Sequence, residues 1–230
     1  MTRGTLVVFE GLDRAGKSTQ CERLVSTLQQ EGHKVKHMRF PDRTTTTGQQ
    51  INAYLTSRNE FSDQVIHLLF SANRWEGAAQ IEADIAAGTT VIIDRYYYSG
   101  CVYSAAKKNS QLSLPWARAP EVGLPRPDVV IFLDISEAAA AARGGFGYER
   151  YEKAEMQKEV RRLFGLFRTV LPEKSDFVTV DGGRALEEVG EEVTMAAKKA
   201  MGRVGKEGAE LGRVEPWDGS VIRHLENERR

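Results

Sequence analysis

The sequence GLDRAGKS occupies residues 11–18 and follows directly on the apolar run LVVF of residues 6–9. It fits the pattern G-x-x-x-x-G-K-[ST] of a phosphate-binding loop, whose glycines let the backbone turn its N–H groups toward phosphate oxygens. In such a loop Lys17 reaches the β- and γ-phosphates, and the Ser18 hydroxyl is a ligand for Mg²⁺. A helix after the loop would direct its positive end at those phosphates. The stretch therefore predicts a nucleotide site on an α/β fold.

Short apolar runs alternate with helical patterns along the rest of the chain. The runs that we expect to be strands lie at residues 5–9, 34–39, 90–94, 129–134 and 177–180. The helical patterns lie at residues 18–31, 62–87, 151–171 and 186–201. Nearly continuous Val and Ile is typical of parallel strands that are buried on both faces. We therefore predict a P-loop α/β fold, with a five-stranded parallel sheet flanked by helices on both faces and ligands at the carboxyl ends of the strands.

The whole-chain properties favour one domain and a local anion site. We expect this domain at residues 1–202 and, at residues 203–230, a glycine-rich, charged tail that is weakly ordered or packed on the surface. Lys plus Arg and Asp plus Glu each number 32, so no overall field attracts nucleic acid or anionic lipid. Cys21 and Cys101 lack metal-ligand spacing and are expected to be free thiols. With neither a long apolar stretch nor a signal-type leader, the expectation is an intracellular, cytoplasmic protein without nucleic-acid or membrane partners.

Four polar residues around the loop point to phosphoryl transfer. Asp94 ends the apolar run VIID, as the Mg²⁺-holding carboxylate of a Walker B strand does. The planar guanidinium of Arg95 suits a phosphate, the alternative being a surface salt bridge. Asp13 would be repelled by the donor phosphates, so we expect it to accept from a hydroxyl or a guanidinium, or else to be a turn former or cap. Arg14 is placed to neutralise charge on a transferred group, as an arginine finger does.

Three further segments suggest an acceptor site. Phe70 and Arg74 share a helical face, where a ring can stack on a base and a guanidinium can donate to a carbonyl of that base. An aromatic residue on a helix is otherwise more often core, and the same caution covers Tyr96, Tyr97, Tyr98 and Tyr103. Arg43 follows the second strand, at the sheet edge that Arg95 also reaches. The glycines and arginines of residues 141–152 predict a mobile lid over the phosphates rather than a plain solvated loop.

Five stretches together resemble the motifs of thymidylate kinases (dTMP kinases) and occur in the order of that family, over residues 5 to about 200. They are FEGLDRAGKSTQ at 9–20, RFPDR at 39–43, LFSANRW at 69–75, DRY at 94–96 and RGGFGYERYE at 143–152. In having an arginine inside the loop, the chain resembles the eukaryotic-like type of this family. The resemblance implies Mg²⁺-dependent transfer of the γ-phosphate of ATP to dTMP, which gives dTDP and ADP for dTTP synthesis, by a homodimer. Residues 109–120 and those beyond 201 match the family poorly.

The resemblance also implies which residues form the site. The catalytic residues would be Lys17, Arg14, Asp94 and Arg95. The ATP-binding residues would be Arg14, Ala15, Gly16, Lys17, Ser18, Thr19, Arg143 and Gly182. The dTMP-binding residues would be Asp13, Phe40, Arg43, Phe70, Arg74, Arg95, Gly100, Tyr103 and Tyr151. The lid residues would be Arg143, Gly144, Gly147 and Arg150, and the metal ligands Ser18 and Asp94.

Within the implied dTMP site each contact has a distinct partner. Phe70 would stack on thymine and Arg74 would donate to its O4. Asp13 would receive the 3′-hydroxyl, and Tyr103 would lie beneath the sugar. Arg43 and Arg95 would hold the phosphate, and Tyr151 would close against the acceptor.

Three other functions can be weighed against this one. A deoxynucleoside kinase would need a carboxylate base after its second strand, and Asp42 has that position, although Arg43 and Arg95 favour a phosphate acceptor. A GTPase switch lacks support because the chain has no N-K-x-D motif. A non-catalytic nucleotide-binding partner is the remaining alternative, and the intact Lys17 and Ser18 argue against it.

Overall fold

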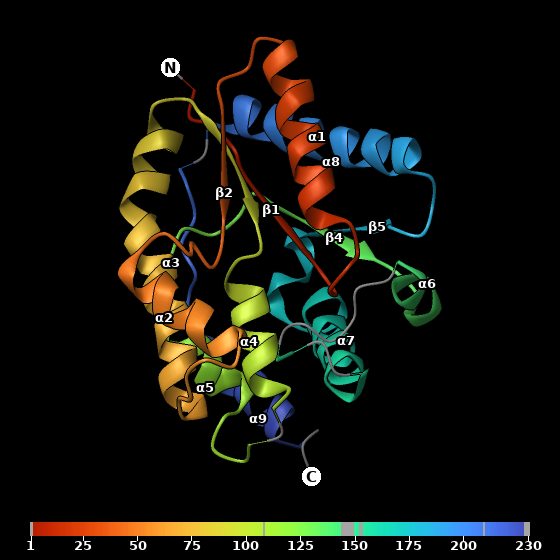
Figure 1. The fold of residues 1–230 in the computed structure, drawn as a ribbon. Coiled ribbons are helices and arrows are strands. Elements are labelled where there is room, and N and C mark those ends of the chain that lie inside the picture. Colours follow the sequence, from red (N-terminus) through yellow and green to blue (C-terminus); the bar gives the residue numbers. More distant parts are fainter. Residues whose placement is uncertain (1, 108, 144–149, 152–153, 209, 228–230) are drawn as a thin grey trace.

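The computed structural model describes all residues except 1, 108, 144–149, 152–153, 209 and 228–230, and in it five parallel strands form one sheet in the order β2-β3-β1-β4-β5 (Figure 1). The strands are β1 (Leu6–Gly11), β2 (Val35–Arg39), β3 (Thr90–Asp94), β4 (Val129–Asp134) and β5 (Phe177–Asp181). Leu6 of β1 lies opposite Val91 of β3, and Val7 lies opposite Val129 of β4. The predicted parallel sheet is confirmed, and its central strand delivers the phosphate-binding loop to the middle of the carboxyl edge.

The helices agree with the predicted patterns and add several short elements. They are α1 (Lys17–Gln30), α2 (Thr46–Leu55), α3 (Asp63–Ala86), α4 (Tyr97–Ala105), α5 (Leu114–Arg118), α6 (Glu137–Ala142), α7 (Ala154–Thr169), α8 (Leu186–Glu207) and α9 (Gly219–Asn227), with single turns η1 (Ala119–Glu121) and η2 (Pro172–Asp176). Most residues of α4 are buried, so this helix has no polar face to mark a helical period. Among the described residues, no helix is both long and apolar enough to cross a membrane.

Helices cover both faces of the sheet (Figure 1). The strand β1 contributes alternate side chains to the two cores. Val7 and Phe9 pack with residues of α1 and α8, whereas Leu6 and Val8 pack with residues of α3, α4 and α7. Such two-sided burial is what the apolar β1 sequence requires. It leaves the carboxyl edge of the sheet as the place where polar side chains converge.

The C-terminal residues pack against the domain. The helix α8 runs to Glu207, so a boundary at residue 202 would fall inside it. Residues 212–214 then lie beside residues 123–126, with Gly123 N–H donating to Val214 O at 2.8 Å and Val214 N–H donating to Leu124 O at 2.9 Å. Val214 and Leu225 are buried, and the Arg118 guanidinium lies 4.6 Å from the centroid of the Trp217 ring. These isolated apolar residues suffice for packing because each docks on a core that the domain already has.

Candidate active site

A cavity of about 420 Å³ lies at the carboxyl ends of β1 and β3. Its lining includes most of the residues that the sequence predicted for the site: Asp13, Arg14, Gly16, Lys17, Ser18, Thr19, Phe40, Arg43, Phe70, Arg74, Asp94, Arg95, Gly100, Tyr103 and Tyr151. Arg39 also lines it, so six cationic side chains face this space with the carboxylates of Asp13 and Asp94. A cavity with this balance of charge suits a polyanion.

The phosphate-binding loop depends on its two glycines. Gly11 has φ of 144° and Gly16 has φ of 89°, a region that other residues rarely adopt. A Cβ atom on Gly11 would lie 2.5 Å from the Leu133 carbonyl oxygen, so the loop also passes too close to β4 for any side chain. The loop ends where α1 begins at Lys17, which places the first N–H groups of that helix beside the cavity.

Lys17 is buried, and its ammonium is held by the loop backbone. Its Nζ donates to Gly11 O at 3.1 Å and to Leu12 O at 2.5 Å. Burial lowers the pKa of Lys17 to about 8, and the charge of Arg95 acts in the same direction. A phosphate bound in the loop would favour the charged form, because an adjacent anion opposes both effects.

Ser18 and Asp94 meet across the sheet edge, as the Walker B interpretation requires. The Ser18 hydroxyl donates to Asp94 Oδ2 at 2.5 Å, and Asp94 is 1% exposed. In the part of the chain that the structure describes, Asp94 Oδ1 has no hydrogen-bond partner although it is buried. A hydroxyl oxygen beside a carboxylate oxygen that lacks a hydrogen bond provides oxygen ligands of the kind that Mg²⁺ prefers. No group of three or more His, Cys, Asp or Glu among the described residues could hold a metal, so a nucleotide or water would have to complete the shell.

Arg95 and Asp13 form an ion pair in the wall of the cavity. Arg95 Nη2 donates to Asp13 Oδ1 at 2.5 Å, and Nη1 donates to Gly11 O and to Ser99 Oγ. The other oxygen of Asp13 accepts from the Tyr103 hydroxyl at 3.0 Å and from Gln157 Nε2 at 2.7 Å. Burial alone would raise the pKa of Asp13, but the charges of Arg95 and Lys17 outweigh it and hold that pKa below its usual value. Asp13 is thus an ionised acceptor, and its partners include the guanidinium and hydroxyl types that the sequence suggested.

Glu10 is a buried carboxylate that the sequence analysis did not single out. Its Oε1 accepts from the backbone N–H groups of Tyr96 at 2.9 Å and Ser99 at 3.0 Å, and its Oε2 accepts from Ser99 Oγ at 2.5 Å. These bonds tie β1 to the first turn of α4 and so fix the direction in which Arg95 leaves β3. The one available signal was a lone carboxylate in an apolar strand, which is costly to bury without partners.

The cavity lining also includes Phe70, Arg74 and Gly100. Phe70 is half-buried and packs against the small core around Ile51 and Ile66. Arg74 Nε and Nη2 donate to the two carboxylate oxygens of Glu121 at 2.8 and 2.5 Å. Tyr97 and Tyr98 do not line the cavity; both are buried in the core, as the cautious alternative allowed.

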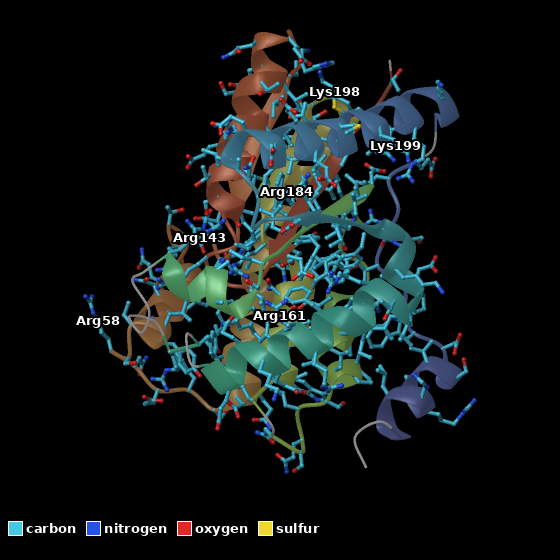
Figure 2. All side chains as sticks on the ribbon, turned by 90° about the vertical axis from the view of Figure 1, so that its right-hand side faces the viewer. Arg58, Arg143, Arg161, Arg184, Lys198 and Lys199 are labelled. Atoms are coloured by element: carbon cyan, nitrogen blue, oxygen red, sulfur yellow. The ribbon has the colours of Figure 1, made fainter. Side chains whose placement is uncertain are left out.

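Several predicted site residues lie elsewhere. Arg143 (Figure 2) reaches from the end of α6 to the loop, where it donates to Arg14 O at 2.8 Å and to Gly182 O at 2.6 Å. It does not line the cavity, and neither do Ala15 and Gly182. Gly144 and Gly147 lie outside the described residues.

Arg150, predicted to be a lid residue, contacts α2 and the connection between α2 and α3. It donates to Glu60 at 2.9 and 2.5 Å and lies 4.3 Å from the centroid of the Tyr54 ring. The sequence gave no sign of this pairing because Glu60 belongs to a distant connection between α2 and α3. Gln157 and Glu121 were missed for the same reason, since their partners are 144 and 47 residues away.

The similar proteins compared below are all described as thymidylate kinases. The sequence profile of the family described as thymidylate kinase matches residues 9–193. A thymidylate kinase of Arabidopsis thaliana is 53% identical over 162 residues, 70% of this chain and 60% of that protein. One of Schizosaccharomyces pombe is 49% identical over 188 residues, 81% of this chain and 88% of that protein. The solved structure of a Candida albicans thymidylate kinase superposes with a TM-score of 0.80 at 34% identity, covering 93% of this chain and 99% of that one.

Replacing Glu10 should separate its hydrogen bonds from its charge. We expect Glu10→Ala to lower the free energy of unfolding by about 3 kcal/mol, because it leaves buried N–H groups of α4 without an acceptor. Glu10→Gln keeps one acceptor oxygen and should cost clearly less. Urea unfolding followed by circular dichroism measures both, and equal losses in the two variants would contradict this role.

Proposed function

The chain belongs to the thymidylate kinase family and is therefore a nucleoside monophosphate kinase acting on dTMP, and we propose that donor and acceptor meet in the cavity described above. The observation that carries this proposal is that the phosphate-binding loop and the Arg95–Asp13 pair line one cavity. ATP would occupy the side formed by the loop and α1. The acceptor would occupy the side formed by α3, α4 and the segment after β2.

On the acceptor side, the proposed contacts follow the chemistry of dTMP. Arg95 and Arg43 bind its phosphate, and Phe70 stacks on thymine. The ionised Asp13 accepts from the 3′-hydroxyl, and Tyr103, whose own hydroxyl already donates to Asp13, supports the sugar. Phe40 and Gly100 complete the wall, and Tyr151 closes against the nucleotide.

The reaction needs no protein base, because the acceptor phosphate has a second pKa near 6 and is largely ionised at neutral pH. An oxygen of that phosphate attacks the γ-phosphorus, the bond to the β–γ bridging oxygen breaks, and ADP leaves with the electron pair. Lys17 binds the β- and γ-phosphates, and Arg14 neutralises the phosphoryl group in transit. These cations offset the repulsion between two anions, which is the main barrier to their approach.

Mg²⁺ is the proposed metal because the Ser18 hydroxyl and the unpaired Asp94 Oδ1 match its preference for oxygen. When bound, the ion supplies charge neutralisation on the phosphates of ATP. We include residues 141–152 as a lid, with Arg143 joining it to the loop through Arg14 O. ATP and dTMP as substrates and the free thiols of Cys21 and Cys101 support an intracellular, cytoplasmic enzyme.

A homodimer is proposed through the exposed apolar face of α3. Val65 is 45% exposed, Leu68 47% and Trp75 41%, and their spacing places them on one side of the helix. A row of large apolar side chains on a long helix is typical of an interaction surface. The same helix carries Phe70 and Arg74 into the cavity, so the interface and the acceptor site would share one rigid element.

The proposed activity predicts a distinct order among possible acceptors. In an assay coupled to ADP release, we expect turnover with dTMP, a modestly weaker rate with dUMP, poor turnover of dCMP and dGMP, and none with thymidine. Arg74 offers only donors, which suit the O4 of thymine and oppose the amino group of cytosine. Chelation by EDTA should stop turnover and excess Mg²⁺ should restore it. Comparable rates with dCMP and dTMP, or a preference for thymidine, would refute the assignment.

The role of Arg14 predicts an effect on the chemical step. Arg14→Ala should lower kcat by about 100-fold or more, with little change in the KM for dTMP, because its contact forms with the moving phosphoryl group. Steady-state kinetics with dTMP and ATP varied separately measures the split. An unchanged kcat would remove Arg14 from the transition state.

The proposed interface predicts a change of mass in solution. Sedimentation should give a dimer for the unmodified chain and a monomer for Leu68→Glu, because a charge at the centre of an apolar interface is costly to bury. Met195→Glu is the matched control, since Met195 is exposed on α8, away from this face. A monomeric unmodified chain, or a dimeric Leu68→Glu, would exclude this interface.

A further inference from the structure

Glu121 lies outside the cavity lining but is bonded to a residue that forms it. It ends the single turn η1 and is 0% exposed. Both of its carboxylate oxygens accept from Arg74, at 2.8 Å from Nε and 2.5 Å from Nη2. A two-point contact of this kind fixes the plane and the direction of a guanidinium as well as its charge.

Gly100 closes the other side of the Arg74 guanidinium. A Cβ atom on Gly100 would lie 2.5 Å from Nη2 and 2.8 Å from Nη1, so only glycine leaves room for the group there. Nε and one N–H of Nη2 donate to Glu121, so both N–H groups of Nη1 and the second N–H of Nη2 are left for the cavity, which both Arg74 and Gly100 line. Arg74 thus reaches the cavity as an oriented donor whose charge is already balanced.

The turn that carries Glu121 is itself held from two directions. The Trp75 indole N–H donates to Pro120 O at 2.8 Å, and Ser71 Oγ donates to the same oxygen at 3.3 Å. On its other side, Gly123 N–H donates to Val214 O at 2.8 Å. The helix α3 therefore carries Arg74 and also contacts the turn that carries Glu121. These contacts hold Arg74 and Glu121 in a fixed relative position.

We propose that Glu121 is the positioning residue that makes Arg74 selective for a carbonyl at position 4 of a pyrimidine, and so sets the preference for thymine over cytosine. This inference rests on the proposed function. A mobile arginine can turn away from an amino group and find another acceptor. One held by Glu121 and Gly100 cannot, so an amino group at that place leaves opposed donors without partners.

The test compares Glu121→Gln with the unmodified enzyme. Glutamine replaces one acceptor oxygen by a donor, so the two-point contact is lost. We expect the KM for dTMP to rise about tenfold or more and the ratio of kcat/KM between dTMP and dCMP to fall by a similar factor. The KM for ATP should stay unchanged, because Arg74 is not on the donor side of the cavity.

Glu173→Gln is a matched control from the same chain. Glu173 is also buried and also accepts from two nitrogens of one arginine, since Arg118 Nε and Nη2 donate to its Oε1 at 2.8 and 2.5 Å. Neither Glu173 nor Arg118 lines the cavity. Both Gln variants should lose thermal stability, and only Glu121→Gln should change selectivity. Equal selectivity in the two variants would show that Glu121 is structural only and overturn the proposal.

Two further variants keep the inference testable if Glu121→Gln does not fold. Glu121→Asp keeps the charge but is one methylene too short for the same contact, and it should shift KM and selectivity in the same direction. In Arg74→Met/Glu121→Leu both charges are absent, which avoids an unpaired buried ion. A folded form of either variant that keeps the original preference for dTMP over dCMP would overturn the inference. Failure of the unmodified chain to use dTMP would instead refute the proposed function.

Discussion

Positive charge buried at one edge of the sheet is the constraint on which the rest of this site depends. Lys17 and Arg74 are buried and Arg95 is largely so, and an isolated ion in such a place would cost several kcal/mol. Each cation therefore has its own oxygen partners: loop carbonyls for Lys17, Asp13 for Arg95 and Glu121 for Arg74. These partners leave the cations charged and oriented before any phosphate arrives, so little reorganisation remains for the reaction.

The carboxylates of the site accordingly serve different purposes. Asp94 retains an oxygen without a partner among the described residues and suits a metal ion. Asp13 is shared between Arg95, Tyr103 and Gln157, which joins the loop to α4 and α7. Glu10 accepts from Tyr96 and Ser99 at the start of α4 and so holds that helix against β1. The sequence does not reveal which carboxylate has which role, because each role follows from the hydrogen-bond donors that the fold brings to each oxygen.

The sheet arrangement explains why the phosphate-binding loop and the residues proposed to bind the acceptor come together. The strand β1 lies between β3 and β4, so the loop after β1 and the Asp94–Arg95 pair after β3 leave neighbouring strands at the same edge. The α3 helix, which connects β2 to β3, then brings Phe70 and Arg74 over that edge. Most of the site residues that the sequence predicted correctly are those that lie at or near the carboxyl ends of parallel strands.

Local patterns by themselves determined the fold class, the loop and most of the residues that line the cavity. Periodic apolar runs, two glycines at fixed spacing, and Asp94 at the end of a strand are all read within a few residues of chain. Tertiary structure alone decided the partners: Glu121 for Arg74, Gln157 for Asp13, and Glu60 for Arg150. The physical reason is that a hydrogen bond depends on distance and direction in space, and these contacts join segments 47, 144 and 90 residues apart.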